Sequence, residues 1–184
     1  MYVITGITGQ VGGTVARTLL AAGKNVRAVV RDASRGGEWL RQGCELALAD
    51  MRDAAALTRA FKGAEAVFVF YAGGEAISFV KQYDSFGLKA ELPLYGSGFL
   101  TSSLYVNAQG PAAEGVITAL HYVPTIDSPA NAQFVEAFTA KTGRVPSEFA
   151  VHGYDAGRAL IEAVKAGATD RESLANALRQ VSFE

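Results

Sequence analysis

The chain has 184 residues, of which 49 % are hydrophobic and 19 % are charged, a size and composition typical of a folded domain and not of a disordered chain. Its 17 basic and 18 acidic side chains nearly cancel, so no charge excess favours nucleic acid or an anionic membrane as a partner. One cysteine, Cys44, excludes an intramolecular disulfide. The apolar runs are too short to cross a bilayer, and the opening residues Met-Tyr-Val-Ile-Thr-Gly do not form an export signal, so we expect a cytoplasmic protein.

The first part of the chain alternates short apolar runs with segments of helical spacing, separated by glycine or polar turns. We expect strands at residues 2–5, 25–30, 45–49 and 67–70, and helices at residues 11–20, around Trp39, and from the N-cap Asp53 to Phe61. The second part begins with the same alternation and becomes helical toward its end. Here we expect strands at residues 92–95 and 115–122, a polar loop at 96–111, and helices at 75–86, 131–142, 149–166 and 171–181.

Strands that alternate with helices at short spacing indicate a parallel sheet covered on both faces. We therefore predict an α/β protein with a single domain at residues 1–184: a doubly wound, three-layer fold with a mainly parallel six-stranded sheet. If the first four strands take the order of a dinucleotide-binding fold, the simplest right-handed continuation gives the Rossmann-like order 3-2-1-4-5-6.

A glycine-rich loop at residues 5–12, Thr-Gly-Ile-Thr-Gly-Gln-Val-Gly, joins the first strand to the first helix. In a phosphate-binding loop, Gly6 would permit the tight turn, Gly9 would let the backbone approach a pyrophosphate, and Gly12 would allow close packing of helix on sheet. The amides that open the helix would point at the ligand. The alternative is a tight turn that binds nothing.

Arg31 stands at the end of the second strand, where a site that prefers NAD usually has a carboxylate. A guanidinium there suits the 2′-phosphate of NADP, and Arg35 can add a second contact. Asp32 follows directly, so an NAD site with a displaced carboxylate stays open. Both arginines can also be solvated loop charges.

Residues 1 to about 70 resemble the NmrA-like branch of the atypical short-chain dehydrogenases. The motifs are the loop at 5–12, Val-Val-Arg-Asp at 29–32, Ala-Asp-Met-Arg-Asp at 49–53 and Phe-Lys-Gly-Ala-Glu-Ala-Val-Phe at 61–68. The resemblance implies NADP as cofactor. It implies a site in which Gly6, Thr8, Gly9, Gln10, Val11 and Gly12 hold the pyrophosphate, Arg31 holds the 2′-phosphate, and Asp50 and Met51 border the adenine.

Residues 64–184 resemble a different family, the C-terminal lobe of periplasmic solute-binding proteins of the branched-chain amino-acid type. Motifs in the matching order include Gln-Tyr-Asp-Ser-Phe-Gly-Leu at 82–88, Leu-Pro-Leu-Tyr-Gly-Ser-Gly at 92–98, Gly-Pro-Ala-Ala-Glu-Gly-Val at 110–116 and Ser-Pro-Ala-Asn-Ala-Gln-Phe at 128–134. The resemblance implies that Tyr71, Ser97 and Gly98 lie near the ligand wall. Because these proteins enclose their ligand between two lobes, we expect one lobe alone to bind an amino acid poorly.

These two resemblances overlap at the strand predicted for Val67–Phe70, which suits both families. We interpret the chain as an engineered chimera, with an NmrA-like half at residues 1–70 and a binding-protein-like half at 64–184. It would have no natural catalytic function, would keep an NADP pocket, and would bind a dinucleotide at most, as a monomer or weak homodimer. The alternatives are an NmrA-like NADPH-dependent reductase or redox-sensing NADP-binding protein, and an amino-acid-binding receptor fragment.

No catalytic residue is predicted. None of the tyrosines has a lysine four residues later, the pair that lowers the pKa of the acid in standard short-chain reductases. His121 and His152 are far apart in sequence and neither lies in a metal-binding spacing, so no metal site is expected. Ser97, Ser102 and Ser103 lack the Gly-X-Ser-X-Gly elbow of a hydrolase.

Overall fold

The computed structural model describes residues 1–50 and 52–182. It comprises two units, Met1–Leu120 and His121–Glu184, each with its own internal contacts. The first unit contains every described strand, and the second is helical. The predicted boundaries at residues 1–70, 64–184 and 1–184 follow resemblance and length, and they stay predictions.

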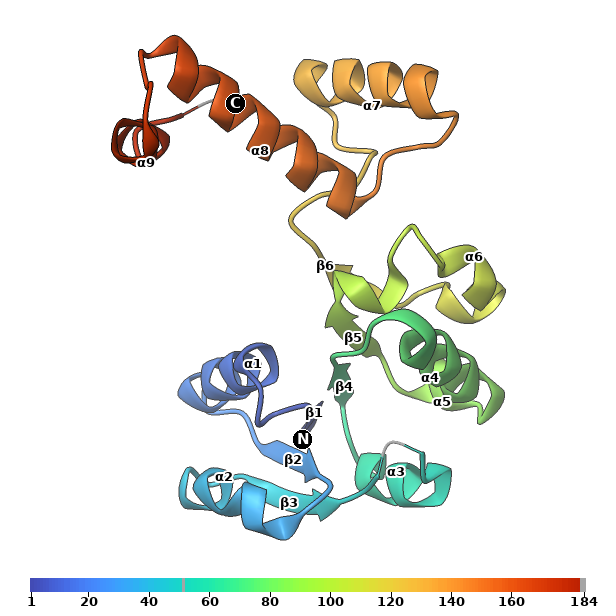
Figure 1. Ribbon diagram of the computed structural model, residues 1–184. Helices are drawn as coiled ribbons and strands as arrows, with labels where there is room; N and C mark the ends of the chain where they lie inside the picture. The colour runs from blue at the N-terminus through green and yellow to red at the C-terminus, as the bar shows by residue number, and fades with distance from the viewer. Residues whose placement is uncertain (51, 183–184) are drawn as a thin grey trace. The chain divides into compact units, whose positions relative to one another are not determined.

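The apolar runs of the first unit form one parallel sheet (Figure 1). Its strands are β1 (Tyr2–Thr5), β2 (Val26–Val30), β3 (Glu45–Leu48), β4 (Ala66–Val69), β5 (Leu94–Ser97) and β6 (Ile117–Ala119). Their order is β3-β2-β1-β4-β5-β6, and every neighbouring pair is parallel. This confirms the predicted α/β class, the six-stranded sheet and the strand order.

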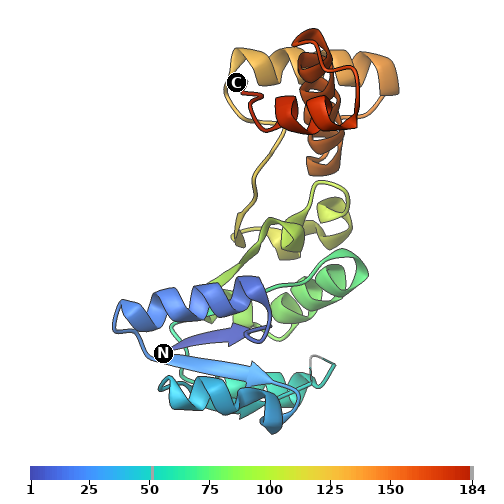
Figure 2. The same ribbon diagram turned by 60° about the vertical axis from the view of Figure 1, so that its left-hand side comes forward.

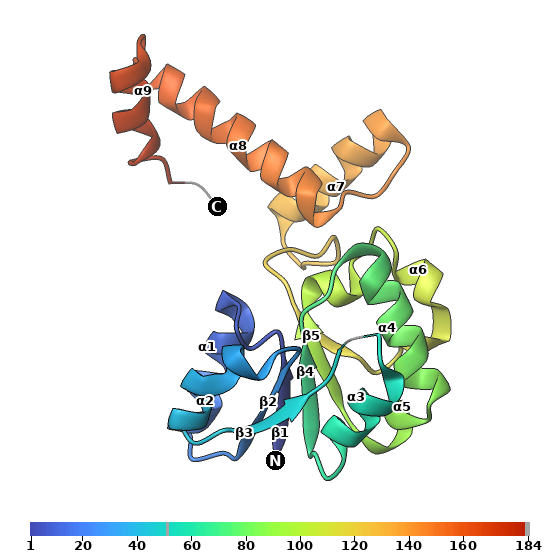
Figure 3. The same cartoon turned by 60° about the horizontal axis from the view of Figure 1, so that its bottom comes forward.

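Alternate residues of the strands enter two different cores, because successive side chains of a strand point to opposite faces. Val3 belongs to the core beneath α3 (Ala54–Phe61) and α4 (Gly73–Ser85), whereas Ile4 belongs to the core beneath α1 (Gln10–Ala21) and α2 (Gly37–Arg41). Figure 3 shows these helix pairs on opposite sides of the sheet. The doubly wound arrangement therefore follows from strands that are apolar on both faces.

Short helical pieces connect α4 to the last two strands: α5 (Leu88–Glu91), η2 (Gly98–Thr101), α6 (Val106–Gln109) and η3 (Gly110–Ala113), with η1 (Ala33–Gly36) after β2. Gln109 is 2 % exposed. Its amide nitrogen donates to the carbonyl oxygens of Ala76 (3.2 Å) and Leu100 (2.8 Å). One buried amide thus joins the irregular segment to both α4 and η2.

The second unit consists of α7 (Pro129–Thr142), α8 (Glu148–Lys165) and α9 (Arg171–Leu178), drawn from orange to red in Figure 2. Asp170 begins α9 with a capping box, accepting from the amide of Ser173 at 2.8 Å. Phe134 lies in an aromatic cluster, with ring centroids 6.2 Å from Tyr122 and 4.5 Å from Tyr154. Among the helices of the described residues, none is both long and apolar enough to cross a membrane.

Several strands begin or end at other residues than predicted, for local reasons. β5 begins at Leu94 because Pro93 has no amide hydrogen for the ladder. β6 begins at Ile117, two residues after Gly115, whose φ of +78° breaks the extended conformation. β4 ends at Val69, so the predicted strand residue Phe70 lies beyond the ladder with 40 % of its surface exposed.

On the side of the sheet that α1 covers, β5 and β6 are less covered than β1 and β2. Phe68, Tyr95 and Ile117 are in register on adjacent strands, so their side chains lie in one row on the α1 side of the sheet. Tyr95 is 39 % exposed and Ile117 is 53 % exposed. An apolar row therefore reaches the surface here.

Replacing Leu100 by alanine tests the core of the first unit. The side chain is fully buried against α4 and the sheet, so Leu100→Ala should lower the free energy of unfolding by about 2–5 kcal/mol in urea titrations. Leu104, 62 % exposed, is the matched control, and Leu104→Ala should change it by less than about 0.5 kcal/mol. Equal effects would show that this assignment of the core is wrong.

Candidate ligand-binding site

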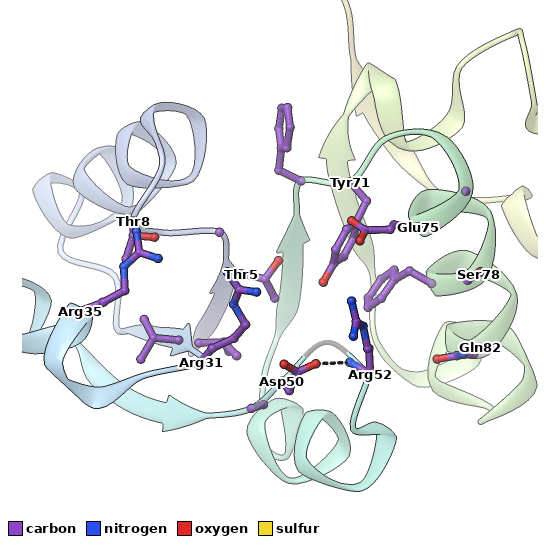
Figure 4. Close-up of a pocket in the computed structure, with 17 residues that line it drawn as sticks. Thr5, Thr8, Arg31, Arg35, Asp50, Arg52, Tyr71, Glu75, Ser78 and Gln82 are labelled. Atoms are coloured by element: carbon purple, nitrogen blue, oxygen red, sulfur yellow. Dashed lines mark hydrogen bonds between the residues drawn. The ribbon is translucent and has the colours of Figure 1, made fainter.

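A cavity of about 650 Å³ lies at the carboxyl ends of the strands of the first unit. Thr5 at the end of β1 and Phe70 just after β4 both line it, although 65 residues separate them in the chain. The order of the strands reverses between β1 and β4: from β1 the chain continues to β2 on one side, and β4 lies on the other side. Ligands of open α/β sheets usually bind at this position. Figure 4 shows the side chains that surround it.

The cavity walls carry charges of both signs. Arg31 and Arg35 follow β2, Arg52 precedes α3, Asp50 follows β3, and Glu75 lies in the first turn of α4. Oδ1 of Asp50 accepts from the amide of Arg52 at 2.9 Å, drawn as a dashed line in Figure 4. Within the described residues, no salt bridge joins these arginines to a carboxylate. These described arginines and carboxylates line the cavity without forming salt bridges to each other.

Tyr71 supplies a neutral hydroxyl at the centre of the site. Its ring packs on Phe79 with centroids 4.9 Å apart, and Figure 4 shows its hydroxyl directed toward the interior of the cavity. This hydroxyl is buried and has no hydrogen-bond partner among the described residues. Burial raises the pKa of Tyr71, Glu75 and Asp50 raise it further, and Arg31 opposes them. Tyr71 therefore stays protonated and can donate to a ligand.

The structure separates the predicted cofactor residues into two groups. Gly6, Thr8, Arg31, Arg35 and Asp50 line the cavity, whereas Gly9, Gln10, Val11 and Gly12 do not. Met51 lies outside the described residues. Arg31, selected by its place at a strand end, and Asp50, taken over from the resemblance, thus line one cavity, whereas the start of helix α1 does not reach it.

Backbone packing accounts for the glycines of this loop without a ligand. Gly6 has a φ of +64°, and its carbonyl oxygen accepts from the amide of Gly9 at 3.0 Å, closing a tight turn. A Cβ on Gly12 would lie 2.5 Å from the same oxygen, so helix α1 can pack here only with glycine. The glycine spacing that was interpreted as a pyrophosphate-binding loop is therefore explained by the turn and the packing of α1.

A further part of the cavity wall comes from α4, which the sequence did not connect with the site. Glu75, Ser78, Phe79 and Gln82 line the cavity and recur at the spacing of one helix face. The helix was predicted from its apolar residues, on another face, and only the pairing of β1 with β4 shows which face meets the strand ends. Among the residues expected near the ligand wall, Tyr71 lines the cavity.

Ser97 and Gly98 do not line this cavity. The hydroxyl oxygen of Ser97 is buried without a hydrogen-bond partner in the described part of the chain. A Cβ on Gly98 would lie 2.3 Å from Cβ of Leu120. Both positions therefore serve packing beside β5 and β6.

Comparison with known proteins gives a consistent result. A family model described as periplasmic binding protein matches residues 10–184. The Leu/Ile/Val-binding protein homolog 6 of Brucella melitensis is 35 % identical over 109 residues, covering 56 % of this chain and 28 % of that protein. An ABC transporter substrate-binding protein from Sphaerobacter thermophilus aligns at 30 % identity and a TM-score of 0.71, over 92 % of this chain and 52 % of that one.

A solute-binding protein of an ABC transporter from R. palustris, solved in complex with benzoate, is 31 % identical with a TM-score of 0.68, over 96 % of this chain and 53 % of that one. The chain thus spans about half the length of these solved structures and less of the curated relative. A likeness to an NADPH-dependent quinone oxidoreductase from Escherichia coli has a TM-score of 0.44 and carries no functional argument.

These comparisons correct several predictions. The NADP cofactor and the dinucleotide partner are wrong, because the matching proteins are named for amino-acid or solute binding. The engineered chimera is not supported, since one family model extends from residue 10 through both proposed halves, and the NmrA-like half has no separate support. The cytoplasmic location is contradicted as well, because the matching family is periplasmic.

The burial of Tyr71 predicts a loss of stability at alkaline pH. Its pKa in the folded protein is raised from the ordinary value of 10.0, so its contribution to stability is complete below about pH 10 and declines above that pH as the unfolded tyrosine ionises. In urea titrations at about pH 9 and pH 11, Tyr71→Phe should lose less stability than the unmodified protein. Tyr95→Phe, at an exposed ring, controls for the loss of one hydroxyl, and identical losses in all three proteins would contradict the prediction.

Proposed function

Because the chain belongs to the periplasmic binding protein family, we propose that it is a ligand-binding portion of the solute receptor of an ABC transporter. Its ligand is an amino acid with an apolar side chain, bound in the cavity at the strand ends of the first unit. The names of the relatives support a small organic solute and a transporter permease as partner. They also support a periplasmic location.

The guanidinium groups form the end of the cavity that receives the ligand carboxylate. Arg31 and Arg35 both line it, and a guanidinium can donate two parallel hydrogen bonds to a carboxylate. The hydroxyl of Tyr71 is a further donor, because it is protonated and has no partner among the described residues. Binding would satisfy this buried group, which otherwise carries a desolvation cost.

The two carboxylates of the cavity suit the ammonium group of the same ligand. Asp50 and Glu75 line the wall toward β3 and α4, and one oxygen of Asp50 is already oriented by the amide of Arg52. The aromatic pair Tyr71 and Phe79 provides an apolar surface in the same cavity. An amino acid with an apolar side chain matches all three features.

The presence of both charge signs in one cavity is the observation that carries this proposal. A benzoate-like ligand would use the arginines and the aromatic rings but would leave Asp50 and Glu75 near its negative charge. A zwitterion pairs with both. Since the chain spans about half of its solved relatives, and full burial of a ligand requires a closed cleft, we expect modest affinity.

The role of Arg31 can be tested by calorimetric titration with leucine. We expect saturable binding to the unmodified chain and binding about 10- to 100-fold weaker in Arg31→Ala, the range given by a lost charged hydrogen bond of about 1.5–3 kcal/mol. Arg41, an exposed arginine of α2 outside the cavity, is the matched control, and Arg41→Ala should bind leucine as the unmodified chain does.

Benzoate and the variant Glu75→Gln separate the ligand classes. Glu75→Gln should weaken leucine binding and strengthen any benzoate binding, because it removes a negative charge from the wall. If the unmodified chain binds benzoate more tightly than leucine, the ligand is an aromatic acid and not an amino acid. Equal losses in Arg31→Ala and Arg41→Ala would place the ligand elsewhere.

A further inference from the structure

The two histidines of the chain, separated by 31 positions, meet in the second unit. His121 opens this unit and His152 lies on α8. Their Nε2 atoms form a hydrogen bond, and their ring centroids are 4.3 Å apart with an angle of 43° between the planes. The fold therefore creates a pair of imidazoles that no local spacing in the sequence indicates.

A hydrogen bond between the two rings requires one donor and one acceptor nitrogen. In a hydrogen bond between two Nε2 atoms, one nitrogen donates its hydrogen and the other accepts with its lone pair. Such a bond therefore needs a lone pair on one of the two Nε2 atoms. When both neutral rings carry their hydrogen on Nδ1, the two Nε2 lone pairs face each other and are available to one metal ion. Neutral imidazole nitrogen is the commonest protein ligand for metal ions.

The backbone around the pair is held by an aromatic cluster. Tyr122 follows His121 directly, and Tyr154 lies two residues after His152. Both tyrosine rings pack on Phe134 of α7, with centroids 6.2 Å and 4.5 Å away. The two histidines thus lie next to tyrosines that pack on the buried ring of Phe134, which helps to place the ligand pair.

We propose that His121 and His152 form a two-imidazole binding site for a divalent transition-metal ion such as Zn²⁺. Zn–N bonds of about 2.0–2.1 Å in tetrahedral geometry would place the two nitrogens on the order of 3.3 Å apart. From the hydrogen-bonded contact the rings would have to separate and turn toward a common ion, and both side chains are exposed. Imidazole suits Zn²⁺, Cu²⁺ and Ni²⁺.

Water completes the coordination at this site. The described residues contain no group of three or more His, Cys, Asp and Glu side chains placed to hold a metal ion. With two protein ligands the ion is exchangeable, unlike that of a closed structural site. Its effect is to join the segment at the start of the second unit to α8, so binding should stabilise the fold of this unit.

Calorimetric titration of the tag-free full chain with ZnCl₂, after removal of bound metal, tests the proposal. We expect one ion per chain. His121→Ala and His152→Ala should each bind Zn²⁺ at least about 10-fold more weakly, and Zn²⁺ should raise the thermal midpoint of the unmodified chain but not of either variant. Both histidines are exposed, so the variants should fold, which circular dichroism will check.

Cys44 is the matched control for a competing ligand. It is the single cysteine and is buried in the first unit, so Cys44→Ala should leave Zn²⁺ affinity unchanged. In NMR spectra, the imidazole signals of His121 and His152 should shift together in the same titration step. Unchanged affinity in either histidine variant, loss of binding in Cys44→Ala, or a shift of one imidazole alone would overturn the proposal.

Discussion

The parallel pairing of β1 with β4 is the constraint on which the first unit depends. Val3 and Val67 are partners in this ladder, 64 positions apart in sequence, and both are fully buried. The pair separates the chain that passes to β2 and β3 from the chain that passes to β5 and β6. It also brings the residues after β1, β2 and β3 to the same edge as the start of α4, and the candidate cavity lies where they meet.

The cavity gains its charged character from this meeting of distant segments. Arg31 and Asp50 come from one side of the pairing and Glu75 from the other. The apolar part of the wall is formed by Tyr71, which follows β4, and by Phe79 of α4, on which its ring packs. A ligand with two opposite charges and an apolar body, as proposed above, would contact both halves of the sheet, so its binding would couple segments that are joined mainly through the central strands.

Local signals in the sequence predicted the elements well and the site only in part. Asp53 was expected to cap a helix and accepts from the amide of Ala56 at 2.9 Å, because capping depends on neighbouring residues. Arg31 was selected because strand ends share an edge, whereas Asp50 was taken over from a resemblance whose cofactor is wrong. Glu75 was missed, since its place at the site depends on tertiary pairing, and so was the contact of His121 with His152. The cofactor was wrong because a glycine triad serves a tight turn as well as a phosphate.

The apolar row formed by Phe68, Tyr95 and Ile117 bears on how the protein behaves in concentrated solution. Two of its three members are more than a third exposed, and the formal charge of the chain is −1 at pH 7. Electrostatic repulsion between molecules is therefore weak, while this apolar row is exposed to solvent. This row is therefore a candidate for self-association, and a lysine in place of Ile117 would interrupt it without changing either candidate site.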